Sequence, residues 1–142
     1  MAEQAIVKPP TVVELIWEHD LVFGARSGDV TMILDSASKT GPSPMQALAF
    51  ALAGCMAMDV VHILKKGRLE LRGLRADLTG TRANEEPRRF TAINLHYTIT
   101  GVIPKEQIAR AIDLSREKYC SVWHSLRQDL PFDVTFSVAP GA

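Results

Sequence analysis

Two cysteines are the side chains best suited to chemistry in this sequence, and the first lies in a strongly apolar segment. Cys55 follows Gly54, and Asp59 and His62 lie four and seven residues after it. On a helix these spacings place the three polar side chains on one face. Gly54 in a helix interior costs roughly 0.8–1 kcal/mol relative to Ala, and close approach of another backbone or of a ligand is the usual compensation. Cys55 is equally consistent with a small buried core residue, with Asp59 and His62 bonded to each other or to a strand backbone.

The second cysteine, Cys120, lies where two predicted helices meet, with His124 four residues further on. A thiol at a helix N-terminus gains thiolate character, because the helix dipole and the free backbone amides favour negative charge. Helix position therefore favours Cys120 over Cys55 as the more acidic thiol. A buried residue at a helix junction, beside an exposed or capping His124, is the alternative. The cysteines are 65 residues apart in the chain, and this separation does not reveal whether they meet in space.

Other chemistry has little support in the sequence. Cys55, Asp59, His62 and His124 are candidate metal ligands, but they match no recognised metal-site spacing. The chain has no glycine-rich phosphate loop, no HExxH, no paired CxxC and no nucleophile elbow. Sixteen Lys and Arg against sixteen Asp and Glu argue against a nucleic-acid binder. Two cysteines in 142 residues are too few for a secreted disulfide scaffold.

The elements that must position these residues begin with three short strands. Alternation over residues 11–18 predicts a half-buried strand, with Val13, Leu15 and Trp17 on one face. Residues 21–25 and 30–34 predict two more strands, joined by a turn over residues 26–29. The short connections predict an antiparallel meander.

A long central helix is predicted over residues 44–66. Ser43 suits the N-cap, Pro44 suits the first helical position, Gln46 completes a capping box, and Gly67 ends the helix. The segment is apolar nearly all round, which predicts burial on most sides and, in a chain of 142 residues, burial against a second subunit.

The apolar segment is long enough to raise the question of a membrane span. Gln46, Asp59 and His62 interrupt it, and the rest of the chain has amphipathic patterns. We therefore expect a buried central helix and no membrane association. The first ten residues lack an apolar targeting segment, so we expect a cytoplasmic protein whose free thiols stay reduced.

The second half predicts a long hairpin, two helices and a final strand. The hairpin arms span residues 69–82 and 88–100, with a bulge at Gly73, where the alternation slips. A helix over 104–119, a short helix over 120–126 and a strand over 132–138 follow. Because the strands come in runs, we expect an α+β fold with mainly antiparallel sheets, in a single domain over residues 1–142.

Two cysteine-bearing stretches resemble those of one protein family. They are Gly41–Leu48 with Ala53–Val61, and Ser115–Val122. They are similar to the central helix and the second cysteine segment of the OsmC/Ohr family of osmotically inducible and organic-hydroperoxide-resistance proteins, and element order agrees over residues 11–138. The continuation Asp59–Lys66 resembles a less-characterised branch. The resemblance implies an OsmC-like intertwined homodimer, with two central helices packed together and the sites at the subunit interface.

The resemblance also implies a thiol peroxidase that reduces organic hydroperoxides. Cys55 attacks the peroxide and becomes a sulfenic acid, Cys120 resolves it as a disulfide, and an external lipoyl or thioredoxin-like dithiol restores both thiols. No metal, haem, flavin or other cofactor is required. Family enzymes place an Arg and a first-turn Glu around the thiolate. Arg26 is the candidate arginine, and Met45 and Gln46 occupy the Glu positions, where Gln46 can hydrogen-bond an arginine or a peroxide oxygen.

A second interpretation keeps the fold without the activity. A non-catalytic OsmC-like dimer with a narrow apolar pocket at the subunit interface would bind a small hydrophobic or thiol-bearing molecule. The distance between the two sulfurs and the presence of an arginine beside Cys55 discriminate between the two interpretations.

Overall fold

The computed structural model describes residues 7–139. Their elements run in the order three strands, a long helix, two strands, a helical region and a last strand. The chain divides into two compact units, Met1–Ala47 and Leu48–Ala142, and each is described here by itself. The single domain over residues 1–142 stays a prediction.

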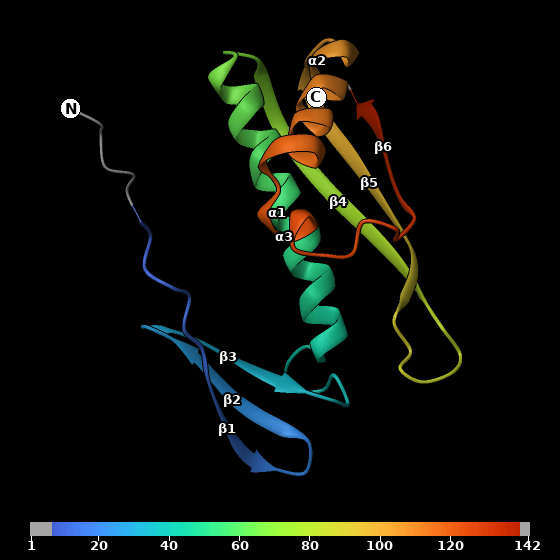
Figure 1. The fold of residues 1–142 in the computed structure, drawn as a ribbon. Helices are drawn as coiled ribbons and strands as arrows, with labels where there is room; N and C mark the ends of the chain where they lie inside the picture. The colour runs from blue at the N-terminus through green and yellow to red at the C-terminus, as the bar shows by residue number, and fades with distance from the viewer. Residues whose placement is uncertain (1–6, 140–142) are drawn as a thin grey trace, which may run out of the picture. The chain divides into compact units, whose positions relative to one another are not determined.

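The first unit contains a small antiparallel sheet in the order β1-β2-β3 (Figure 1). The strands are β1 (Glu14–His19), β2 (Val22–Ser27) and β3 (Val30–Asp35). The predicted meander is confirmed. The predicted half-burial of the first strand is wrong within the single chain, because every residue of β1 is exposed. Residues 7–47 contain no second layer to cover this sheet, and a sheet face is buried only when another layer packs on it.

The loop after β3 is organised around a buried carboxylate. Asp35 accepts hydrogen bonds from the backbone of Ala37 (2.9 Å), Lys39 (3.2 Å) and Thr40 (3.0 Å), and from the Thr40 hydroxyl (3.0 Å). Bonds to the backbone amides of Thr40 and Ala37 are the main reason that the pKa of Asp35 falls to about 2. A carboxylate that accepts several such bonds is stabilised in its charged form.

The long helix α1 (Pro44–Lys66) begins with the predicted capping box. The Ser43 hydroxyl accepts a bond from the Gln46 amide (3.2 Å), and Gln46 Oε1 accepts one from the Ser43 amide (3.0 Å). Gln46 Oε1 also accepts a bond from the Ser38 hydroxyl (2.7 Å). These reciprocal bonds use amides that the first helical turn leaves free. At its C-terminal end the helix stops before Gly67, as predicted. The residue with left-handed backbone geometry there is Arg68, with φ 58°.

One face of α1 is buried in the second unit and the opposite face is not. Leu52, Met56, Val60 and Leu64 form the buried stripe. Phe50 and Met58, by contrast, are 71% and 73% exposed. The expectation of burial on most sides is therefore not met within one chain. By length and composition α1 passes a test for a membrane-crossing helix, which the core helices of soluble proteins pass as well.

The second sheet has the order β4-β5-β6. The hairpin of β4 (Glu70–Arg82) and β5 (Phe90–Val102) is antiparallel, and its register shifts between Leu71 and Gly73, which confirms the predicted bulge. The last strand, β6 (Phe132–Ala139), pairs with β5 in parallel. The described sheets are therefore mainly antiparallel, as expected, and this one pair is parallel. The chain crosses over through a helical region before it returns, and such a crossover brings a strand back in the same direction.

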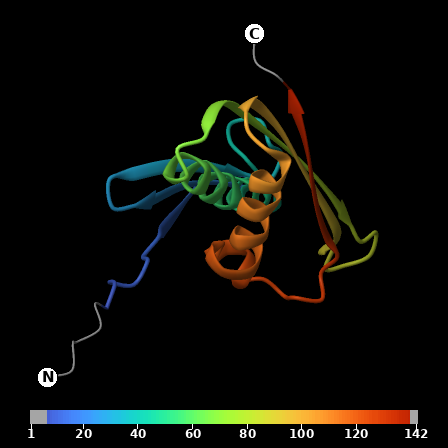
Figure 2. The same cartoon turned by 90° about the horizontal axis from the view of Figure 1, so that it is seen from above.

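The crossover is α2 (Lys105–Leu114), the π turn η1 (Ser115–Tyr119) and α3 (Ser121–His124). Figures 1 and 2 show α1 and α2 on one face of this sheet. Apolar side chains of α1, α2 and β5 share one core with Cys120 and Trp123. The α+β fold is confirmed, and the core lies between the helices and the sheet.

Candidate functional site

Cys55 lies on α1, at the edge of the core of the second unit. It is half-buried. Two residues earlier, the carbonyl oxygen of Ala53 accepts a bond from the hydroxyl of Tyr97, at 3.5 Å. Tyr97 lies on β5 and is wholly buried. Burial is the main reason that its pKa is raised, so Tyr97 remains a neutral phenol and a hydrogen-bond donor beside the cysteine segment.

Cys120 lies at the junction of the π turn and α3, and it is wholly buried. Its amide donates to the carbonyl oxygen of Ser115 at 2.7 Å, the bond that closes the π turn. Its sulfur accepts a bond from the amide of Trp123 at 3.4 Å and so caps the N-terminus of α3. Both the backbone and the sulfur of Cys120 are thereby held in place.

The fold brings the two thiols near each other, although 65 residues separate them in the chain. The pKa of the Cys120 thiol is raised to about 11, mainly by burial and with a smaller contribution from the neighbouring Cys55 and Asp59, against the lowering effect of the Trp123 amide. The expectation that its place at a helix N-terminus gives Cys120 thiolate character is therefore wrong. Removal from water disfavours the thiolate more than one amide at the end of a short helix favours it.

Asp59 has a partner that the sequence did not indicate. Its Oδ2 accepts a bond from the hydroxyl of Ser115 at 2.7 Å, so it is neither paired with His62 nor bonded to a strand backbone. Ser115 is wholly buried, and Ser115 and Tyr97 are the polar neighbours of the thiols that sequence reasoning missed. A serine in a helical stretch and a tyrosine in a strand carry no local signal of such a role.

A groove of about 490 Å³ lies beside Asp59 in the second unit. Its polar lining is Asp59, His62, Lys66, Arg110 and Tyr119. Within residues 48–139, neither Lys66 nor Arg110 forms an ion pair with an acidic side chain. The groove leaves Asp59 in contact with solvent on one side while Ser115 occupies the other.

The four candidate metal ligands do not form a cluster. Across residues 7–139, no group of three His, Cys, Asp or Glu side chains is arranged to hold a metal ion. His124 is exposed at the end of α3. The described residues therefore give the metal interpretation no geometric support.

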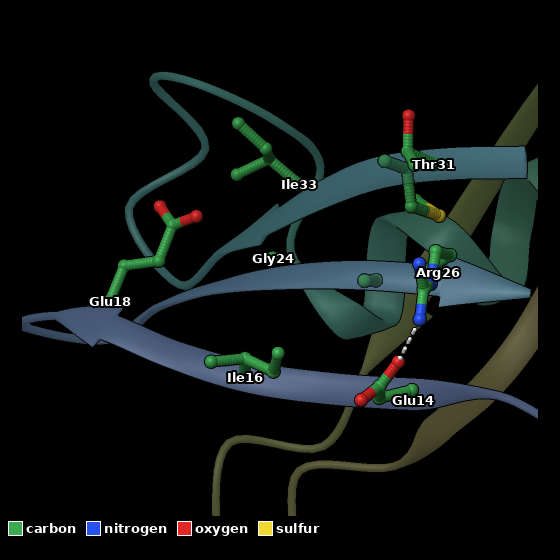
Figure 3. Close-up of a pocket in the computed structure, with 9 residues that line it drawn as sticks. Glu14, Ile16, Glu18, Gly24, Arg26, Thr31 and Ile33 are labelled. Atoms are coloured by element: carbon green, nitrogen blue, oxygen red, sulfur yellow. Dashed lines mark hydrogen bonds and ion pairs between the residues drawn. The ribbon is translucent and has the colours of Figure 1, made fainter.

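Arg26 and Gln46 belong to the first unit, and their roles in the site stay predictions. Arg26 pairs with Glu14 across β1 and β2, at 2.9 Å between Nη2 and Oε2 (Figure 3). Arg26 and Glu14 line a pocket of about 490 Å³ on this sheet, together with Ile16, Glu18 and Gly24. Within residues 48–139, no Lys or Arg side chain hydrogen-bonds to either sulfur.

Comparisons with known proteins agree on one family. The model of the OsmC-like protein family matches residues 36–135. The protein YhfA of Escherichia coli strain K12 is 45% identical over 109 residues, which cover 75% of this chain and 81% of YhfA. The crystal structure of a hypothetical protein from Aquifex aeolicus is 26% identical, with a TM-score of 0.87 over 95% of this chain and 100% of that one.

The fold also matches an organic hydroperoxide resistance protein from Legionella pneumophila. That structure has a TM-score of 0.67 and 17% identity, and the match covers 94% of this chain and 100% of the other. At this identity the likeness concerns the fold alone. The family model and the identity to YhfA carry the assignment: this chain belongs to the OsmC-like protein family.

Proposed function

We propose that this protein is a thiol-dependent peroxidase that reduces organic hydroperoxides through Cys55 and Cys120. The observation that carries the proposal is the nearness of two free cysteines of unequal exposure, one half-buried and one wholly buried. The OsmC/Ohr family is known for hydroperoxide resistance. Nearness of the two sulfurs favours this function over the alternative, a dimer that only binds a small hydrophobic or thiol-bearing molecule.

The first step takes place at Cys55, the less buried of the two cysteines. The Cys55 thiolate attacks the distal oxygen of the hydroperoxide, and the O–O bond breaks. The sulfur is oxidised to a sulfenic acid, and the peroxide is reduced to an alcohol, which takes up the proton released by the thiol. Arg26 and Gln46 are the proposed polar partners of this step.

The second step uses the buried thiol. Cys120 attacks the sulfur of the Cys55 sulfenic acid, a disulfide forms, and the hydroxyl leaves as water with the Cys120 proton. Because the pKa of Cys120 is about 11, this thiol stays protonated at neutral pH and does not compete for the peroxide. An external dithiol of the lipoyl or thioredoxin type then reduces the disulfide, as in a reducing cytoplasm.

We also propose that two copies of the chain assemble through the exposed side of α1. Phe50, Gly54 and Met58 follow one another at intervals of four residues, and an added Cβ at Gly54 would meet no atom within 4 Å. A helix face with two exposed apolar side chains and a glycine between them suits close packing of a second helix. Family members are typically dimeric.

Stopped-flow consumption of cumene hydroperoxide by the reduced full chain tests the proposed activity. We expect Cys55→Ser to lower the rate by at least about a hundredfold, because the nucleophile is lost. Cys120→Ser keeps the first step, so it should accumulate the Cys55 sulfenic acid, which dimedone traps, and form no intramolecular disulfide.

Ser121→Ala, at the exposed residue after Cys120, is the matched control and should behave as the wild type. Equal rates for wild type and Cys55→Ser would exclude the peroxidase and favour the binding module. Wild type that never forms the disulfide after peroxide would remove Cys120 as the resolving residue.

A further inference from the structure

A chain of two hydrogen bonds connects the segments that carry the cysteines. Asp59 lies one helical turn after Cys55, and Ser115 begins the π turn that leads to Cys120. The Ser115 hydroxyl donates to Asp59 Oδ2 at 2.7 Å, and the Ser115 carbonyl accepts from the Cys120 amide at 2.7 Å. Ser115 therefore joins the helix of the first sulfur to the backbone of the second.

Because Ser115 is buried, breaking its hydrogen bond to Asp59 costs more free energy than breaking an exposed one. The Ser115 side chain is wholly removed from solvent. A bond from a hydroxyl to a carboxylate is stronger than one between neutral groups, and a buried hydroxyl without a partner keeps its full desolvation cost. The bond should therefore persist and hold the start of the π turn against α1.

The π turn decides where the second sulfur points. A π turn adds one residue relative to an α-helix, and each α-helical residue rotates the side chain by about 100°. Ordinary α-helical continuation after Ser115 would therefore direct Cys120 elsewhere. Instead Cys120 leaves the helix with φ −70° and ψ 98°, and its sulfur meets the amide of Trp123 near Cys55.

We propose that Asp59 is a positioning residue for the cysteine pair: through Ser115 it holds the π turn that presents Cys120 to Cys55, and it thereby sets how readily the two sulfurs close into a disulfide. The inference rests on the proposed peroxidase function, in which this closure is the second step. Asp59 acts through Ser115 and takes no part in breaking the O–O bond.

The charge of Asp59 and its hydrogen bond are separable by substitution. Asp59→Asn removes the charge and keeps an oxygen that accepts the Ser115 bond. Ser115→Ala keeps the charge and removes the bond, and Asp59→Ala removes both. Asp113→Ala is the matched control, because Asp113 is an exposed aspartate of α2 near the same turn. Circular dichroism checks that each variant is folded. Because Asp59 is only half-buried, its two variants should disturb the fold less than Ser115→Ala does.

The first measurement is the thiol–disulfide equilibrium of the full chain with reduced and oxidised dithiothreitol. Loss of a bond to a charged group should lower the equilibrium constant for disulfide formation about tenfold in Asp59→Ala and in Ser115→Ala. This corresponds to a rise of about 30 mV in the reduction potential of the pair. Asp59→Asn and Asp113→Ala should stay within about threefold of wild type, and the double variant Asp59→Ala/Ser115→Ala should lose no more than either single variant.

The second measurement follows closure after cumene hydroperoxide. Sulfenic acid formation at Cys55 should keep its rate in Asp59→Ala, while disulfide closure slows about tenfold and dimedone traps more of the intermediate. A general loss of structure would lower both rates together.

Several results would overturn the inference. Unchanged equilibrium constants in Asp59→Ala and Ser115→Ala would do so, as would equal losses in Asp59→Asn and Asp59→Ala, which would place the effect in the charge. The two proposals can also be told apart. If the wild type forms the disulfide with oxidised dithiothreitol but does not react with hydroperoxide, the peroxidase is excluded. A tenfold lower equilibrium constant in Asp59→Ala and Ser115→Ala would then still support the positioning role.

Discussion

In the second unit one stripe of apolar side chains on α1 and the alternating apolar side chains of β5 are buried around one core, whereas in the first unit most large apolar side chains of β1 and β3 face solvent. Leu95 on β5 is 1% exposed, and Leu15 on β1 is 49% exposed. Both residues belong to alternating strands with similar sequence patterns. The difference lies in what covers each sheet, because α1 and α2 pack on the second sheet and the first unit has no layer of its own.

This contrast indicates that the second unit supports the cysteine site, whereas the first unit offers a surface for protein contact. The second unit holds both cysteines with Asp59, Ser115 and Tyr97, and its own core supports them. A small sheet with apolar residues in solvent is marginal by itself and marks a surface for further protein contact. The proposed second copy would supply that cover, so we expect the stability of the first unit to depend on protein concentration.

Truncating one leucine in each unit tests the contrast most strongly. Leu95→Ala should lower the free energy of unfolding by about 2–5 kcal/mol, because it leaves a cavity in a packed core. Leu15→Ala should cost less than about 0.5 kcal/mol in the dilute, unassociated chain, since its side chain is already exposed. Urea unfolding at low and high protein concentration measures both, and equal losses in dilute solution would contradict the contrast.

Gly54→Ala sharpens the comparison at the exposed side of α1. Replacing a helical glycine should raise the stability of the dilute chain by up to about 0.8–1 kcal/mol, because the added Cβ meets no atom. The same methyl group should weaken the association of two chains if a second helix packs closely against Gly54. Sedimentation velocity and chemical denaturation of one preparation separate the effects. Tighter association in Gly54→Ala would argue against close packing at this residue.

A pH-dependent effect is expected at Asp35, the buried carboxylate of the first unit. Its folded pKa of about 2 lies below the value of about 3.9 for an unfolded aspartate. Its contribution to stability is therefore present above about pH 4 and is lost as the pH falls towards 2. Asp35→Asn should unfold more easily than wild type at pH 6, and the difference in melting temperature should shrink between pH 4 and 2. A difference independent of pH would assign the effect to packing.

Local chemistry made several elements predictable. Ser43, Pro44 and Gln46 placed the start of α1, and the slip in alternation at Gly73 located the bulge. These features depend on neighbours within a few residues, so the sequence contains them directly. The parallel pairing of β6 and the π turn were missed, because both depend on where the crossover lands on the sheet.

The candidate site was predictable in part. Residue type, spacing and family resemblance make Cys55 and Cys120 candidates, and spacing places Asp59 on the face of Cys55, whereas nothing in the sequence indicates Ser115 and Tyr97. Ser115 begins the π turn, and its neighbours along the chain give no sign that its partner lies 56 residues earlier. Family resemblance names residues that do chemistry, but hydrogen bonds that support them depend on the packing of distant elements.

The sequence by itself determined the long helix, its cap, the α+β class and the two thiols as candidates, because periodicity and residue type act locally along the chain. The tertiary structure alone decided that the thiols lie near each other and that burial raises the pKa of Cys120. Proximity and burial depend on how segments far apart in the chain pack together, and removal of a thiol from water outweighs its favourable place at the end of a helix.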